Sequence, residues 1–101
     1  MTDSPVKNNE SASQFELTAG SEVAVLSYRL QAQSITFVHT GVPKKLEGQG
    51  IAKKLVVAGL EFAREKGLTV VPLCSFVADY ITRHPEYLIL VREDHRARLT
   101  R

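Results

Sequence analysis

The residues of this chain that could bind a charged ligand lie in the segment Glu47-Gly48-Gln49-Gly50-Ile51-Ala52. This segment follows an extended run that ends at His39-Thr40, and it opens a long amphipathic stretch. Because glycine has no Cβ, two glycines let the backbone turn tightly and point successive N–H groups into one space. The first turn of the following helix would add unpaired amides and the positive end of its dipole. We therefore predict an anion site, to which Lys44 and Lys45 could add charge, and a pyrophosphate fits it.

The order of elements around this loop is that of a crossover unit. An apolar run from Thr69 to Cys74 follows the predicted helix, so the loop would lie at the carboxyl end of a strand, where ligands of α/β sheets bind. Dinucleotide-binding folds of the Rossmann type need a third glycine and an acid at the end of the next strand. Lys53 stands in place of that glycine and Cys74 in place of the acid, which disfavours a Rossmann fold. The simpler alternative is a glycine turn that binds nothing.

Two motifs of the chain resemble one known family. The segment Glu47 to Ala52 is similar to the coenzyme A loop of the Gcn5-related N-acetyltransferases, Gln/Arg-x-x-Gly-x-Gly/Ala; its last two fixed positions match, and Glu47 departs from the first. The run Val70 to Val77, followed by Arg83-His84-Pro85-Glu86-Tyr87, resembles the small single-domain branch of that superfamily, the YjdJ-type and N-acetyltransferase-domain-containing-1-like proteins. The resemblance extends from about Phe15 to Val91.

The resemblance implies acetyl-CoA, and so coenzyme A, as the cofactor. In that family an amine attacks the thioester carbonyl directly, while the enzyme aligns the reactants, helps to remove the amine proton and stabilises the oxyanion. Backbone groups of Phe37, Val38 and His39 would pair with the pantetheine arm as an added strand would. The pyrophosphate would lie on the amides of the loop, which belong to Gly48, Gln49, Gly50, Ile51, Ala52 and Lys53.

The resemblance also suggests three side chains for catalysis, each with a plainer alternative. His39 could be the base, since histidine titrates nearest neutral pH, or an ordinary surface residue. Cys74, near the implied thioester, could donate a proton, accept the acyl group, or be a small buried hydrophobe. Tyr80 resembles the tyrosine that protonates the leaving thiolate in many relatives, although core packing would also explain it. For Arg83 and His84 a structural role is favoured over contact with the 3′-phosphate.

Composition is that of a single globular domain. The 101 residues are 44% hydrophobic and 24% charged, which is ordinary for a folded domain of this size. A formal charge of +2 is too small to indicate nucleic acid binding. The single cysteine fits a reducing compartment, and no apolar run approaches the roughly 20 residues that span a bilayer. We expect a cytoplasmic protein with no membrane segment and no metal site.

The pattern of apolar residues predicts strands first and helices later. Strands are expected at Phe15–Leu17, Glu22–Leu30 and Ile35–Val38, because these runs are rich in β-branched and aromatic residues. Their short connections favour an antiparallel meander. The run from Thr69 to Cys74 would add a strand after the crossover helix.

The helical period begins at Gly50, where apolar residues recur at three- and four-residue steps. The helix should end at Lys66, since Gly67 is a typical C-cap. A shorter helix is expected at Phe76–Thr82, and a closing strand or apolar strap at Tyr87–Val91. The fold class is therefore α/β: a minimal acetyltransferase-like fold with a mostly antiparallel sheet, a crossover helix after a glycine loop, and a second short helix.

The ends of the chain differ in composition from its centre. Residues 1–13 are polar, so we expect a disordered tail there. Residues 14–91 would form the acetyltransferase-like domain, and residues 92–101 a basic flexible tail.

Pro72 lies in the strand after the helix, where proline removes a ladder donor. In the acetyltransferase fold the strands on either side of the glycine-loop helix splay apart to admit pantetheine, so the missing N–H would face the gap. The alternative is that this strand is simply an edge.

The short early connections leave no room for the helices that build the acceptor wall in full-length relatives. This favours an amine-bearing small molecule or protein acceptor that docks from outside, or a partner subunit that completes the site. We interpret the chain as an N-acetyltransferase that works by direct attack. The alternatives are a CoA-binding sensor or interaction module without catalysis, and a nucleic-acid binder, for which no RNP-like aromatic pair is present.

Overall fold

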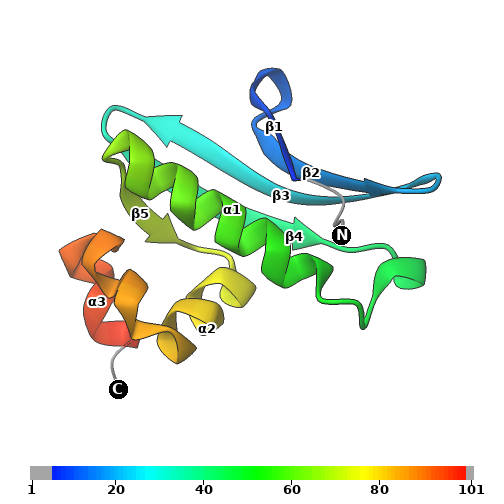
Figure 1. The fold of residues 1–101 in the computed structure, drawn as a ribbon. Helices are drawn as coiled ribbons and strands as arrows, with labels where there is room; N and C mark the ends of the chain where they lie inside the picture. Colours follow the sequence, from blue (N-terminus) through cyan, green and yellow to red (C-terminus); the bar gives the residue numbers. More distant parts are fainter. Residues whose placement is uncertain (1–5, 100–101) are drawn as a thin grey trace.

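The structure is a computed structural model that describes residues 6–99 (Figure 1). Five strands form one sheet in the order β1-β2-β3-β4-β5, and all neighbours are antiparallel except β4 and β5. The strands are β1 (Lys7–Asn9), β2 (Gln14–Ala19), β3 (Glu22–Gln31), β4 (Ser34–Gly41) and β5 (Thr69–Pro72). The helices are α1 (Ile51–Lys66), α2 (Ser75–Arg83) and α3 (Glu93–Leu99), with short 3₁₀ turns η1 (Glu10–Ala12), η2 (Lys44–Leu46) and η3 (Pro85–Leu90).

The predicted fold class is confirmed: a mostly antiparallel sheet, a crossover helix and a second short helix. Helix α1 begins directly after Gly50 and ends at Lys66, as predicted. Gly67 is the C-cap: it adopts φ 66°, and its N–H donates to the carbonyls of Ala63 and Arg64. The connections β2–β3 and β3–β4 are two residues long, as a meander requires. None of the helices within residues 6–99 is long and apolar enough to cross a membrane.

The expected tail at the N-terminus is wrong for Lys7–Ala12, which forms β1 and η1. Strand β1 pairs with β2, and the Tyr28 hydroxyl donates to Asn8 Oδ1 at 2.6 Å. Burial raises the pKa of the Tyr28 phenol, so this hydroxyl stays a donor at neutral pH. Strand β1 could not be predicted from its polar composition, because its asparagine side chains form hydrogen bonds with polar groups of β2 and β3. Residues 1–5 of the expected tail lie outside the described residues.

The expected flexible C-terminal tail is also corrected, because Glu93–Leu99 forms α3 and the Leu99 side chain is only 6% exposed in the core. Residues 100–101 lie outside the described part. The strand or strap expected at Tyr87–Val91 is the 3₁₀ turn η3, and only Val91 makes a bridge, with Val70. Pro85 at the start of η3 fixes φ in the helical range, which favours a turn over a strand.

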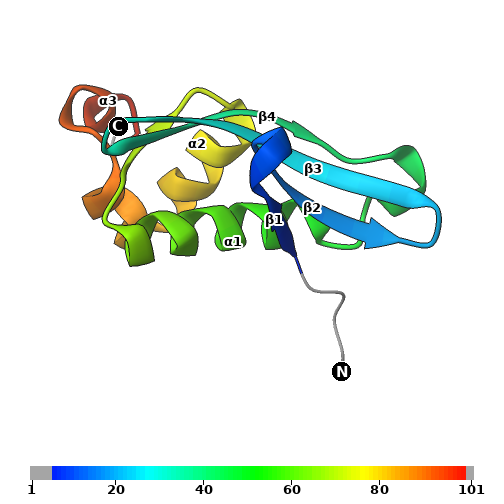
Figure 2. The same ribbon diagram turned by 90° about the horizontal axis from the view of Figure 1, so that it is seen from above.

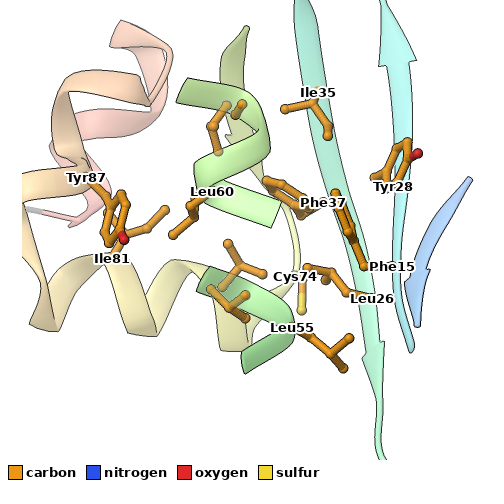
Figure 3. Close-up of a cluster of buried hydrophobic side chains, with 14 of the residues drawn as sticks. Phe15, Leu26, Tyr28, Ile35, Phe37, Leu55, Leu60, Cys74, Ile81 and Tyr87 are labelled. Carbon is orange, nitrogen blue, oxygen red and sulfur yellow. The ribbon is translucent and has the colours of Figure 1, made fainter. Parts of the chain in front are cut away.

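Helix α1 lies across one face of the sheet, and α2 lies beside α1 at the β5 end (Figures 1 and 2). The core lies between α1 and the sheet, with Phe15, Leu26 and Phe37 from the strands and Leu55 and Leu60 from the helix (Figure 3). On β3 the residues that face α1 are buried, whereas Val23 on the other side is 44% exposed. At β3 the sheet is therefore covered from one side, as the alternation along this strand implies, whereas both Val70 and Val71 of β5 are buried.

Helix α1 lies very close to the sheet at Gly59. A Cβ on Gly59 would lie 2.8 Å from Phe37 Cε1 and 3.1 Å from Leu26 Cδ2. These distances are shorter than van der Waals contact, so the glycine sets how near the helix axis lies to β3 and β4.

We predict that Gly59→Ala lowers the free energy of unfolding. Overpacking a core costs about 1–3 kcal/mol, which exceeds the helix-propensity gain of roughly 0.5–1 kcal/mol. Urea unfolding measures the difference. Trimming the opposing ring in Gly59→Ala/Phe37→Leu should cost less than the sum of the two single changes. An unchanged or raised stability for Gly59→Ala would contradict the close approach.

A second prediction concerns Ala32 in the β3–β4 turn, whose φ is 51°. Left-handed backbone strains any residue with a Cβ, so Ala32→Gly should stabilise the protein by up to about 1 kcal/mol. The matched control is Ala97→Gly in α3, an exposed helical position where the same change should destabilise. Thermal unfolding of the two variants should therefore shift in opposite directions; a parallel shift would refute the turn assignment.

Candidate functional site

The glycine loop lies between η2 and α1, with Gly48 at φ 82° and Gly50 at φ 74°. Both glycines have left-handed backbone angles, which residues with a Cβ rarely adopt. A Cβ added to either glycine would meet nothing within 4 Å, so the requirement for glycine comes from backbone conformation and not from packing. Gly50 is the N-cap of α1, and it has no side chain to cap the helix.

The first turn of α1 therefore presents free amides. The Lys54 N–H donates to the Gly50 carbonyl at 3.2 Å, which makes it the first helical hydrogen bond. Ahead of it, the amides of Ile51, Ala52 and Lys53 donate to no acceptor among the described residues. Together with the helix dipole they form the kind of site that binds phosphate groups.

A hollow of about 260 Å³ opens directly beside these amides. The side chains of Lys53 and Phe76 contribute a cation and an aromatic ring to its wall. Lys53 also borders two other hollows, one of about 200 Å³ along α2 and one of about 610 Å³ on the opposite flank of α1. The lining of the first hollow is Val42, Leu46, Glu47, Gly48, Gly50, Ile51, Ala52, Lys53 and Phe76.

Strands β4 and β5 part close to this hollow. Their ladder ends at the pair Phe37–Pro72, while β4 continues to Gly41. The Cys74 N–H closes the ladder by donating to the Phe37 carbonyl at 2.9 Å. Strand β5 is the edge of the described sheet, which agrees with the plainer explanation of Pro72; the residue also forms the last pair of the ladder with β4, and the splay that would admit pantetheine stays a prediction.

A β-bulge on β4 decides which side chains face the core. Tyr28 pairs with Phe37 and Ser27 with His39, so Val38 is an extra residue on β4. Before the bulge, Phe37 faces the core; after it, Thr40 does. Strict alternation from Phe37 would have turned His39 inward. His39 is instead exposed, and its ring lies beside Gly41 on the other face.

The bulge brings Thr40 to Cys74. Thr40 Oγ1 and Cys74 Sγ are 3.1 Å apart, within hydrogen-bond distance for sulfur, and the Cys74 side chain is 7% exposed. Cys74 immediately precedes α2 and lies among the buried side chains near Leu26 and Leu55 (Figure 3). Sequence reasoning missed Thr40 because no local signal marks the bulge, which depends on the pairing of β4 with β3.

The other two predicted catalytic residues lie elsewhere. Tyr80 lines the 200 Å³ hollow along α2, where its ring stacks on His84 at a centroid distance of 4.0 Å. His39 lies on the sheet face that α1 does not cover. The structure therefore brings Cys74 together with Thr40, and it does not gather Cys74, His39 and Tyr80 in one hollow.

Comparisons with known proteins agree with this geometry. The family model described as GCN5-related N-acetyltransferase matches residues 14–90. Protein NATD1 from Homo sapiens is 36% identical over 63 residues, which is 61% of this chain and 56% of that protein. Protein NATD1 from Danio rerio is 30% identical over 88 residues, 82% of this chain and 80% of that protein. This chain thus spans little more than half of several of these relatives.

A solved structure gives the same fold. The solution structure of a GCN5-like protein from Staphylococcus aureus superposes with a TM-score of 0.70 at 30% identity and covers 91% of each chain. The family model accounts for the sheet from β2 onward, the glycine loop, α1 and α2. On this match and on the fold, the chain belongs to the GCN5-related N-acetyltransferase family.

Proposed function

We propose that this chain binds acetyl-CoA at the glycine loop and transfers the acetyl group to an amine. The observation that carries the proposal is the uncapped start of α1, where three free amides open onto a hollow next to the point at which β4 and β5 part. Use of acetyl-CoA and transfer to amines are general properties of the family to which the chain belongs.

The pyrophosphate of the cofactor would lie on the amides of the loop, from Gly48 to Lys53. The helix dipole and the Lys53 ammonium would both stabilise its charge. The pantetheine arm would then enter between β4 and β5. Because the Phe37 carbonyl already accepts from Cys74, pantetheine would pair with the backbone beyond it, at Val38 and His39.

For the chemistry we propose direct attack. The amine nitrogen forms a bond to the acetyl carbon, the carbon–sulfur bond breaks, the amine loses a proton and the coenzyme A thiolate gains one. The Cys74 thiol would supply that proton, held in place by the Thr40 hydroxyl. His39 would accept the amine proton on the open sheet face, from which the acceptor arrives.

The exposed surface around Val23 and His39 would affect the size of acceptor that the protein could use. On the sheet face opposite α1, Val23 is 44% exposed and His39 is exposed, although Val71 at the β5 end of that face is buried, so a large acceptor would find open surface around His39. This favours an amine on a protein, or a bulky small molecule, and it leaves room for a partner subunit. A reducing compartment such as the cytoplasm suits the single free thiol.

The second candidate is a CoA-binding module without transferase activity. One observation favours it: Thr40 and Cys74 interact with each other, while His39 lies across the sheet from them. Turnover of acetyl-CoA with a panel of amines and peptides separates the two functions.

We predict that Gly50→Val weakens coenzyme A binding at least tenfold, about 1.4 kcal/mol. A β-branched residue at φ 74° would force the loop out of the conformation that aligns its amides. The matched control is Gly20→Val in the β2–β3 turn, where φ is 63° and no ligand is proposed. Titration calorimetry should show lost affinity only for Gly50→Val. Equal affinity for the two variants would contradict the loop assignment.

A further prediction concerns the only thiol. Under direct attack, incubation with acetyl-CoA alone leaves no stoichiometric acetyl group on Cys74, and Cys74→Ser keeps measurable turnover because its hydroxyl can donate a hydrogen bond to the leaving thiolate, which then takes its proton from water. Intact-protein mass spectrometry and steady-state kinetics test both statements. A hydroxylamine-sensitive acetyl adduct on Cys74 that passes to an amine, together with ping-pong kinetics, would establish the covalent route instead.

A further inference from the structure

Two rows of side chains cross the sheet on the face that carries His39. The strands β2, β3 and β4 are in register there, and residues paired on neighbouring strands point to the same face. This face is the one opposite α1, and the acetyl transfer proposed above uses His39 alone among the residues of the two rows. The first row is Gln14, Ser27 and His39, and the second row is Glu16, Val25 and Gly41.

The imidazole of His39 leans from the first row into the second. Gly41 has no side chain, and a Cβ placed on it would lie 3.3 Å from His39 Nε2 and 3.7 Å from Val25 Cγ2. The ring therefore occupies space that a side chain at position 41 would need, and it lies near Val25. A glycine at this position lets the proposed base reach the second row.

A carboxylate held by two amides lies at the other end of the second row. Glu16 Oε2 accepts a hydrogen bond from Gln14 Nε2 at 2.6 Å and another from Asn9 Nδ2 at 2.9 Å. These bonds, the one from Gln14 most of all, lower the pKa of the Glu16 carboxyl, so the group is an anion at neutral pH. Neither bond uses Oε1, which can therefore accept from a ligand.

The second row thus places a base, an apolar side chain and an anion in sequence across the sheet. Neighbouring strands lie about 4.8 Å apart, so Glu16 and Gly41, which are two strands apart, are separated by roughly 10 Å. Val25 lies between them and is only partly buried. An amine, an apolar chain and a second ammonium group would match these three features in the same order.

Two cations share this face. Lys7 lies opposite Glu16 on β1 and contributes to the low pKa of its carboxyl, and Arg29 lies opposite Thr36, on the far side of the first row from Glu16. Arg29 would repel a second ammonium group at its end of the face, whereas Glu16 would attract one. Lys7 would compete for the carboxylate, so its removal should strengthen the attraction.

We propose that the acceptor is a dication, whose reacting amine lies at His39 and whose second ammonium group lies at Glu16, with an apolar chain across Val25. Linear polyamines and protein segments with two lysines share this chemistry. The inference rests on the proposed function, because His39 must be the base, and it goes further by naming the class of acceptor.

The test compares 1,8-diaminooctane with octylamine, which has the same chain and one amine. Glu16→Gln should lower kcat/KM for the diamine about fivefold and for octylamine less than about twofold, since exposed ion pairs are weak. Lys7→Gln should raise kcat/KM for the diamine alone. The matched control Glu65→Gln, on α1 across the sheet, should change neither value. Gln at position 16 keeps an oxygen that accepts from Asn9 and Gln14, and thermal unfolding checks that the variant is folded.

Chain length gives a second readout. The amines of 1,3-diaminopropane are too close together to span two strand spacings, so Glu16→Gln should change its kcat/KM less than about twofold. A Glu16→Gln effect of the same size on both diamines would contradict the placement of the second ammonium group at Glu16.

The source of the dication is tested with two N-acetylated peptides, one with two lysines separated by a single residue and one with only the first lysine. A Glu16-dependent preference for the two-lysine peptide, with little turnover of the long diamine, supports a protein acceptor. The reverse result supports a linear polyamine.

The failures of the two proposals are distinguishable. If the wild-type chain acetylates amines and Glu16→Gln changes kcat/KM equally for acceptors with one and two positive charges, the dication is wrong and acetyl transfer stands. If the wild-type chain binds acetyl-CoA but acetylates none of these amines and peptides, transfer and the dication are both wrong.

Discussion

Phe37 is the residue on which the arrangement of the site depends. Its ring lies under Gly59, so it sets how closely α1 approaches the sheet. Its carbonyl accepts the Cys74 N–H, and its pairing with Pro72 is the last in the β4–β5 ladder. The bulge at Val38 follows it at once. One fully buried aromatic residue thus fixes where the β4–β5 ladder ends and how close to the sheet α1, with its free N-terminal amides, lies.

Two changes of direction in the backbone position the groups of the candidate site. The bulge reverses which residues of β4 face the core, so the hydroxyl of Thr40 reaches the thiol of Cys74. The left-handed glycines turn the chain so that the free amides of α1 face the hollow beside the diverging strands. The bulge needs one extra residue on β4. The turn before α1 needs residues without a Cβ, because its backbone is left-handed.

The described part of the chain adds an element to the family fold at each end. Strand β1 extends the sheet through the Tyr28–Asn8 hydrogen bond, and α3 covers the core through Leu99. Strand β1 lies at the edge of the sheet beside β2, and α3 packs against α2. Substrate selection would then depend on what the acceptor itself brings to the surface around His39.

The sequence by itself determined the elements whose signals are local. The extent of α1 and its C-cap at Gly67, the β2–β3–β4 meander and the glycine loop all follow from residue periodicity and from backbone angles that particular residues prefer. These features need only neighbouring residues, and so they could be predicted correctly. The free amides at the start of α1 could be anticipated for the same reason, because they are backbone groups.

Only the tertiary structure decided which side chains meet. The bulge that turns Thr40 toward Cys74 and His39 away depends on the register of β4 against β3. The docking of β1 depends on Tyr28, which lies 20 residues from Asn8, and the hollow that joins Lys53 to Tyr80 and Arg83 depends on how α2 packs beside α1. The periodicity of a single segment carries no record of such contacts, because their energy comes from residues distant in sequence that become neighbours only when the chain has folded.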